Sequence, residues 1–139
     1  MTIAREKIKE EKGQAVIEFA FVVPIVLLLV MVGITLSLFI YSQIIVTMSA
    51  SNGARVGAAI WHNDTYSQAE KTEKIKNAAL AQVESNLYGE ERRYKVDHSE
   101  GMLRVTVEYD FKVALPFSSL IFDEGIIVIV HTAEIYVGD

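Results

Sequence analysis

The residue in the most unusual surroundings is a glutamate that lies inside apolar sequence. Glu18 stands between Ile17 and Phe19, and no further Asp, Glu, Lys or Arg occurs before Arg55. An acidic side chain costs about 2.5–3.5 kcal/mol at the centre of a bilayer and less near its surface. Two interpretations are therefore open. Glu18 marks the edge of a membrane helix, where the N-terminal dipole favours a negative charge, or it has a function that needs its charge.

The other polar residues do not form a pattern that supports catalysis. His62, His98 and His131 lack the HxxxH or HExxH spacing of a metal site. The acidic pairs at 90–91 and 123–124 adjoin glycine-containing turns, whereas a calcium loop needs a longer alternating set of acids. The sequence has no cysteine, P-loop or nucleophile elbow. We therefore expect no enzyme activity, no metal and no cofactor.

Composition places most of the excess hydrophobicity in one segment. The chain has 139 residues, of which 51% are hydrophobic and 22% charged, with a net charge of −5. The 36 positions from Phe19 to Ala54 carry no charged residue. What remains is enough for one small domain. The acidic balance offers no basic surface for nucleic acid, so we expect no nucleic-acid partner.

The first part of this uncharged run predicts a transmembrane helix in contact with membrane lipid. Residues 19–41 are apolar enough to cross a bilayer, which requires about 20 residues. A cleaved secretory signal is disfavoured, because its apolar region has about 7–15 residues. Lysines and arginines precede the segment at positions 5, 7, 9 and 12, whereas Arg55 alone follows closely. The positive-inside rule therefore predicts a cytoplasmic N-terminus and an exported C-terminal part.

The sequence around Glu18 resembles the processing site of type IV pilin-like proteins. A short charged leader ends in Gly13, and Gln14, Ala15, Val16 and Ile17 separate this glycine from Glu18. The stretch GQAVIEFAFVVP and the leucine-rich run after it are most similar to TadE-like pseudopilins of tight-adherence pilus systems. The small-residue segment SASNGARVGAA, at positions 49–59, is similar to the stretch that follows the spanning helix in that family.

This resemblance implies a minor pilin or pseudopilin that a prepilin peptidase cleaves between Gly13 and Gln14. Glu18 and Phe19 would serve assembly with other pilin or pseudopilin subunits and an inner-membrane platform. The location implied is the bacterial cytoplasmic membrane and, after assembly, an extracellular pilus for adhesion or secretion. Phe19 replaces the tyrosine usual in major pilins, and cleavage would leave 126 of the 139 residues, long for a major subunit. Both departures favour a minor subunit.

Two other functions remain as alternatives. The first is a membrane-anchored interaction protein of a pilus or secretion assembly that never polymerises. The second is a membrane-tethered enzyme or ligand-binding head, which no site residue supports. The N-terminus of the purified protein distinguishes them, because only the pilin interpretation requires a mature chain that begins at Gln14.

The helix is expected to continue beyond the membrane over residues 14–61, with a kink at Pro24, which removes one backbone hydrogen bond. Small residues recur along one face after the span, at Ala50, Gly53, Ala54 and Gly57. Such residues allow close packing of another element. We prefer packing on the protein's own sheet to packing between molecules, although a pilin could use both.

The remaining sequence predicts an exported α+β head over residues 62–139, after a cytoplasmic leader at 1–13. An amphipathic helix is expected from Ser67 to Leu87, capped by Asp64 or Ser67, stopped by Gly89 and bearing a solvated charged face. Strands are expected at 92–97, 103–113 and 125–137, with a turn at 98–101. The fold class is therefore α+β and type IV pilin-like, with a three-stranded antiparallel sheet packed on the long helix.

Overall fold

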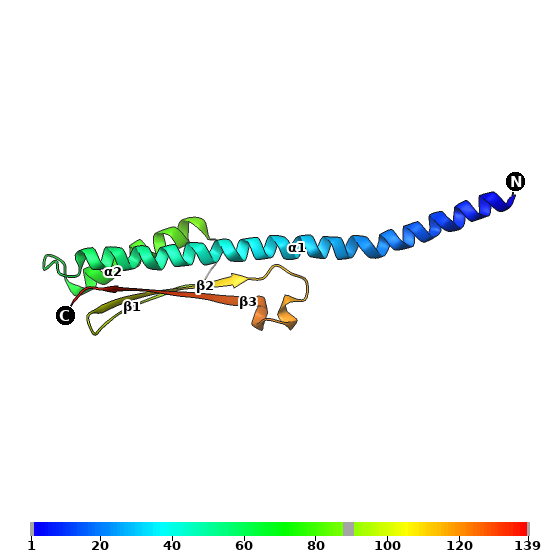
Figure 1. The fold of residues 1–139 in the computed structure, drawn as a ribbon. Coiled ribbons are helices and arrows are strands. Elements are labelled where there is room, and N and C mark those ends of the chain that lie inside the picture. The colour runs from blue at the N-terminus through cyan, green and yellow to red at the C-terminus, as the bar shows by residue number, and fades with distance from the viewer. Residues whose placement is uncertain (1, 88–90, 139) are drawn as a thin grey trace. The chain divides into compact units, whose positions relative to one another are not determined.

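A computed structural model describes residues 2–87 and 91–138, with side chains described from Gly13 onward. It contains a long apolar N-terminal helix, a second helix and a three-stranded antiparallel sheet (Figure 1), which confirms the α+β fold class. The chain divides into two compact units, residues 1–36 and residues 37–139.

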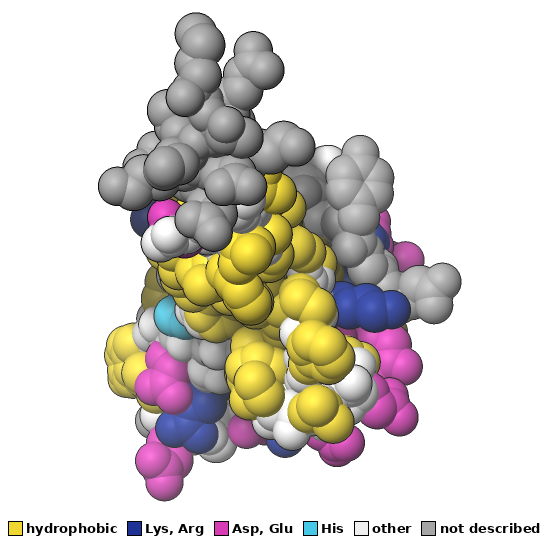
Figure 2. Space-filling view, turned by 90° about the vertical axis from the view of Figure 1, so that its right-hand side faces the viewer, with side chains coloured by type: hydrophobic (Ala, Val, Ile, Leu, Met, Phe, Trp, Pro, Cys, Tyr) yellow, Lys and Arg dark blue, Asp and Glu magenta, His cyan; other side chains and the backbone are white. Residues whose placement is uncertain are grey.

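Helix α1 runs from Thr2 to Ile60 and contributes to both units. It begins earlier than the predicted residue 14, because residues 2–12 contain good helix formers and neither proline nor glycine. In the first unit the apolar side chains from Val16 to Val30 are exposed, apart from a half-buried Val23. Hydrophobic side chains also form much of the face seen in Figure 2. Within the described residues α1 is long and apolar enough to cross a membrane over part of Gly13–Ile60.

The sheet of the second unit follows chain order. Strands β1 (Arg92–Ser99), β2 (Met102–Lys112) and β3 (Ile126–Tyr136) pair antiparallel in the order β1-β2-β3. The first hairpin closes through Glu100 and Gly101, whose φ angles are 53° and 71°. Positive φ at both central residues is typical of a type I′ turn, whose twist matches that of the two strands it joins. The turn is thus shorter than the predicted 98–101.

One face of this sheet forms the core of the head together with two helices. Alternate residues of β2 from Leu103 to Phe111 are buried, as their period-2 pattern predicts. They pack with buried residues of α1, including Val46 and Ala50, and of α2 (Gln68–Asn86), including Ile75. In Figure 1 both helices lie on the same side of the sheet. The predicted packing of the sheet on the long helix is therefore observed, with α2 as a second cover.

Helix α2 begins with a capping box. The Ser67 hydroxyl accepts a hydrogen bond from the Glu70 amide (3.3 Å), and the Glu70 carboxylate accepts one from the Ser67 amide (2.8 Å). The hydrogen bond from the Ser67 backbone amide to the Glu70 carboxylate stabilises the charged form and is the main cause that lowers the pKa of Glu70. Of the two predicted caps, Ser67 is thus the one used. The helix ends at Asn86 with Leu87 as its C-cap, and the predicted stop at Gly89 lies outside the described residues.

The predicted solvated charged face of α2 is wrong at one residue. Glu70, Glu73 and Lys74 are exposed, but Lys71 is only 5% exposed. Its ammonium group donates to the backbone carbonyl of Trp61 at 2.5 Å, just beyond the last residue of α1. Carbonyls at a helix C-terminus lack intrahelical partners and carry partial negative charge, so a cation is favourable there. Lys71 therefore caps α1 from the neighbouring helix.

Candidate processing and assembly site

The residues at the predicted cleavage position are accessible within the first unit. Gly13 and Gln14 are both exposed and lie inside α1. A Cβ atom added at Gly13 would meet no atom within 4 Å. Within the first unit, the conformation of this peptide bond is therefore constrained only by the helical backbone of α1. A protease that needs an extended chain would have to unwind this turn, which glycine makes easier by about 1 kcal/mol relative to alanine.

Glu18 and Gln14 lie one helical turn apart and interact directly. The Gln14 side-chain amide donates a hydrogen bond to the Glu18 carboxylate at 3.1 Å, and both side chains are exposed. Residues four apart on a helix are neighbours on the same face. If the chain were cut before Gln14, the new amino group would therefore lie one helical turn from the Glu18 carboxylate.

Phe19 and Pro24 belong to the same exposed stretch of α1. The Phe19 side chain is 69% exposed and therefore free to contact lipid or another chain. Pro24 lies inside α1, which continues through it to Ile60. The kink at this residue and the role of Phe19 in assembly stay predictions.

The small residues predicted for helix packing lie inside the head. Ala50 and Ala54 are buried, with 0% and 3% exposure. A Cβ at Gly53 would lie 2.8 Å from the Ala79 Cβ atom, and one at Gly57 would lie 2.3 Å from a methyl group of Leu103. The structure thus uses this face for close approach of α1 to α2 and β2 of the same chain.

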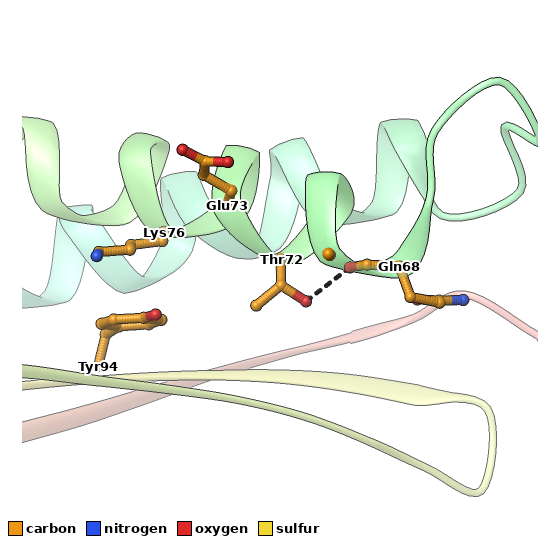
Figure 3. A pocket seen from close by; sticks show the side chains of 6 residues that line it. Gln68, Thr72, Glu73, Lys76 and Tyr94 are labelled. Carbon is orange, nitrogen blue, oxygen red and sulfur yellow. Dashed lines mark hydrogen bonds between the residues drawn. The ribbon is translucent and has the colours of Figure 1, made fainter.

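A groove of about 530 Å³ lies between α2 and β1, and Figure 3 shows the side chains that line it. Its most distinct feature is Lys76, whose ammonium nitrogen lies 5.1 Å from the ring centroid of Tyr94. Thr72 donates a hydrogen bond to the backbone carbonyl of Gln68 at 2.9 Å. These contacts stabilise the groove wall and bring no base together with a nucleophile. Among the described residues, no group of three His, Cys, Asp or Glu could hold a metal ion.

The exposed segment between β2 and β3 has no role among those predicted from the sequence. This segment contains the short helices η1 (Ser118–Leu120) and η2 (Asp123–Gly125), and Phe117 before them adopts a left-handed conformation with φ 65°. The sequence feature that distinguishes this segment is the uncharged run from Ala114 to Phe122, which directly follows a strand of alternating polarity.

In the part of the chain that the structure describes, a candidate membrane helix is combined with a small α+β head. Residues 13–55 match the sequence model of the family described as TadE-like protein. The match begins at Gly13 and includes Glu18, so the TadE-like resemblance of this region is confirmed. No curated protein and no solved structure matches the chain.

Proposed function

We propose that this protein is a minor pilin or pseudopilin of a tight-adherence pilus system, cleaved by a prepilin peptidase after Gly13. The observation that carries the proposal is the TadE-like match, which starts at Gly13 and covers the region through Arg55. The exposed Gly13–Gln14 bond and the apolar helix after it support the proposal, because both are needed for cleavage at a membrane surface. We place the N-terminus in the cytoplasm, α1 in the bacterial cytoplasmic membrane and the head outside.

The role proposed for Glu18 follows from its distance of one turn from Gln14. Cleavage would give Gln14 an α-amino group, which is charged at neutral pH because its ordinary pKa is about 8. A carboxylate and an ammonium group are each costly inside a membrane and much less so when paired. The Glu18 carboxylate would pair with this amine in its own chain or in a neighbouring subunit. Pairing between chains would bring a new subunit into axial register with an assembled one.

Processing is tested by the mass of the protein purified from membranes that contain the peptidase. We expect a mature chain that begins at Gln14. In a Gly13→Leu variant the precursor should accumulate, because a leucine side chain would occupy the position where the enzyme meets only a hydrogen atom. Gly13→Ala, which adds a single methyl group, is the matched control and should be cleaved to a larger extent. Normal maturation of the leucine variant would show that the cleavage site is elsewhere.

Assembly is tested with three substitutions at Glu18, by blotting membranes and sheared filaments for the subunit. Glu18→Val should keep membrane insertion and cleavage but lose incorporation into filaments or into the assembly complex. Glu18→Gln keeps the shape and removes the charge, so it should fail like valine if ion pairing is required. Glu18→Asp keeps the charge on a shorter side chain and should be partly impaired. Wild-type incorporation of the valine variant would favour a membrane-anchored protein that is not polymerised.

A further inference from the structure

The segment between β2 and β3 presents three large apolar side chains to the surroundings. Phe117, Leu120 and Ile121 are 75%, 81% and 78% exposed. They lie within the uncharged run from Ala114 to Phe122. Single exposed apolar residues are common, whereas three in five positions without an intervening charge suggest a contact with an apolar partner. We call residues 117–121 the apolar loop.

The apolar loop is folded into a turn rather than extended, and part of its backbone is hydrogen-bonded locally. The amides of Leu120, Ile121 and Phe122 donate to carbonyls of residues 117 and 118 at 2.9–3.1 Å. Leu115 and Phe122, on either side of the loop, are half-buried and pack against the core. An unpaired polar backbone group is costly in lipid, so each of these hydrogen bonds lowers the cost of bringing this turn close to lipid.

The apolar loop lies at the end of the head where the apolar part of α1 enters it. Phe111, near the end of β2, contacts Phe39 of α1 edge to face, with ring centroids 5.4 Å apart. Phe39 belongs to the predicted span 19–41, whose last residue, Tyr41, has a side chain that is 44% exposed. The second unit begins at residue 37, so chain connectivity alone places a membrane crossed by α1 next to this end.

We propose that the apolar loop inserts into the surface of the lipid bilayer that α1 crosses and so forms a second membrane contact of the head. Aromatic and aliphatic side chains favour the interfacial region, about 5–10 Å deep, without spanning the membrane. The inference requires only that α1 spans a bilayer. It does not depend on processing or on pilus assembly, so its failure would leave those proposals standing.

Fluorescent probes on the full-length protein in vesicles test this contact. The sequence has no cysteine, so single cysteines can be introduced and labelled with an environment-sensitive dye. The test position is Ser119, whose replacement by cysteine leaves the three apolar side chains in place. The matched control is Tyr136, which is 69% exposed at the opposite end of β3. Phosphatidylcholine vesicles are suitable because Asp123 and Glu124 follow the loop and anionic lipid would repel them.

Spin-labelled lipid in the same vesicles should quench the dye at Ser119→Cys about threefold more than the dye at Tyr136→Cys. Adding Leu120→Ser and Ile121→Ser to the Ser119→Cys chain should remove this difference. Both results should be the same when the protein is diluted tenfold with lipid. Equal quenching at the two positions would overturn the proposal. An apolar environment at position 119 that disappears on dilution would also overturn it, because another copy of the chain would then cover the loop.

Discussion

At the scale of single residues, Gly53 shows how closely the long helix approaches the rest of the head. A Cβ atom there would lie 2.8 Å from the Ala79 Cβ and 3.0 Å from a Val105 methyl group. The Ala79 Cβ is fixed to the backbone of α2 and cannot rotate away. Glycine is therefore needed for contact between α1 and α2, despite its low helix propensity.

The residue-scale prediction is that Gly53→Ala destabilises the head. Overpacking a tight contact costs about 1–3 kcal/mol, whereas alanine brings a gain of about 1 kcal/mol to a helix. The distance of 2.8 Å to the Ala79 Cβ is so short that we expect a cost in the upper part of this range. The matched control is Gly33→Ala, because a Cβ there would meet no atom within 4 Å. Urea unfolding of the full-length protein in detergent, followed by the fluorescence of its single tryptophan, measures both. If Gly53→Ala unfolds at the same or a higher urea concentration than the unsubstituted protein, the contact is looser than described.

The candidate processing and assembly site was predictable from the sequence, whereas the burial of Lys71 and the exposure of the apolar loop were not. Gly13, Glu18 and the following apolar run are adjacent in the chain, so their order alone shows the resemblance that the family match confirms. The burial of Lys71 was not predictable, because its neighbour Trp61 lies across a loop and the surrounding charged residues suggest a solvated face. The apolar loop was missed for a related reason, since its exposure depends on how the flanking residues pack.

At the scale of elements, the period of the hydrophobic pattern predicted most of the head. The alternation along β2 and the four-residue spacing along α2 each identify a buried face, because only one side of each element meets the core. Element ends were less predictable. The ends depend on local features such as the capping box at Ser67 and the positive φ of Glu100. These features are determined by the adjacent backbone as well as by residue type.

Lys71 carries the prediction at this scale, because it links the end of α1 to α2. Replacing it with methionine keeps an unbranched side chain but leaves the Trp61 carbonyl without this donor. Loss of one partner of a buried hydrogen bond costs about 1–3 kcal/mol. We expect Lys71→Met to lower the urea midpoint and to speed amide hydrogen exchange in the last turn of α1.

The matched control for this change is Lys74→Met, on the exposed side of α2, where the ammonium group lies 4.8 Å from the Tyr66 ring centroid. An exposed cation–π contact of this kind contributes about 0.5–1 kcal/mol. Similar losses of stability from both variants would indicate that the hydrogen bond from Lys71 to the Trp61 carbonyl contributes no more than an exposed contact.

At the scale of the whole molecule, the division of α1 between two units decides which fragment can fold. The core of the head includes Ile45, Val46, Ala50 and Ala54 of α1, all of which belong to residues 37–139. A fragment of residues 62–139 lacks them, although it contains the complete sheet and α2. Its β2 face, from Leu103 to Phe111, would keep only one of its two covering helices and expose an apolar patch.

We therefore expect residues 62–139 to aggregate or to bind the dye ANS strongly, and residues 37–139 to be monodisperse in the same mild detergent. The detergent is needed because the longer fragment retains exposed apolar side chains of α1 such as Leu38 and Ile44. Size-exclusion chromatography with light scattering and near-ultraviolet circular dichroism compare the two fragments. Adding a peptide of residues 37–61 to the short fragment should restore part of the native signal. The short fragment already contains the three strands of the sheet and lacks the side chains of α1 that cover it. A monodisperse 62–139 fragment with native dichroism would show that α2 alone covers the sheet.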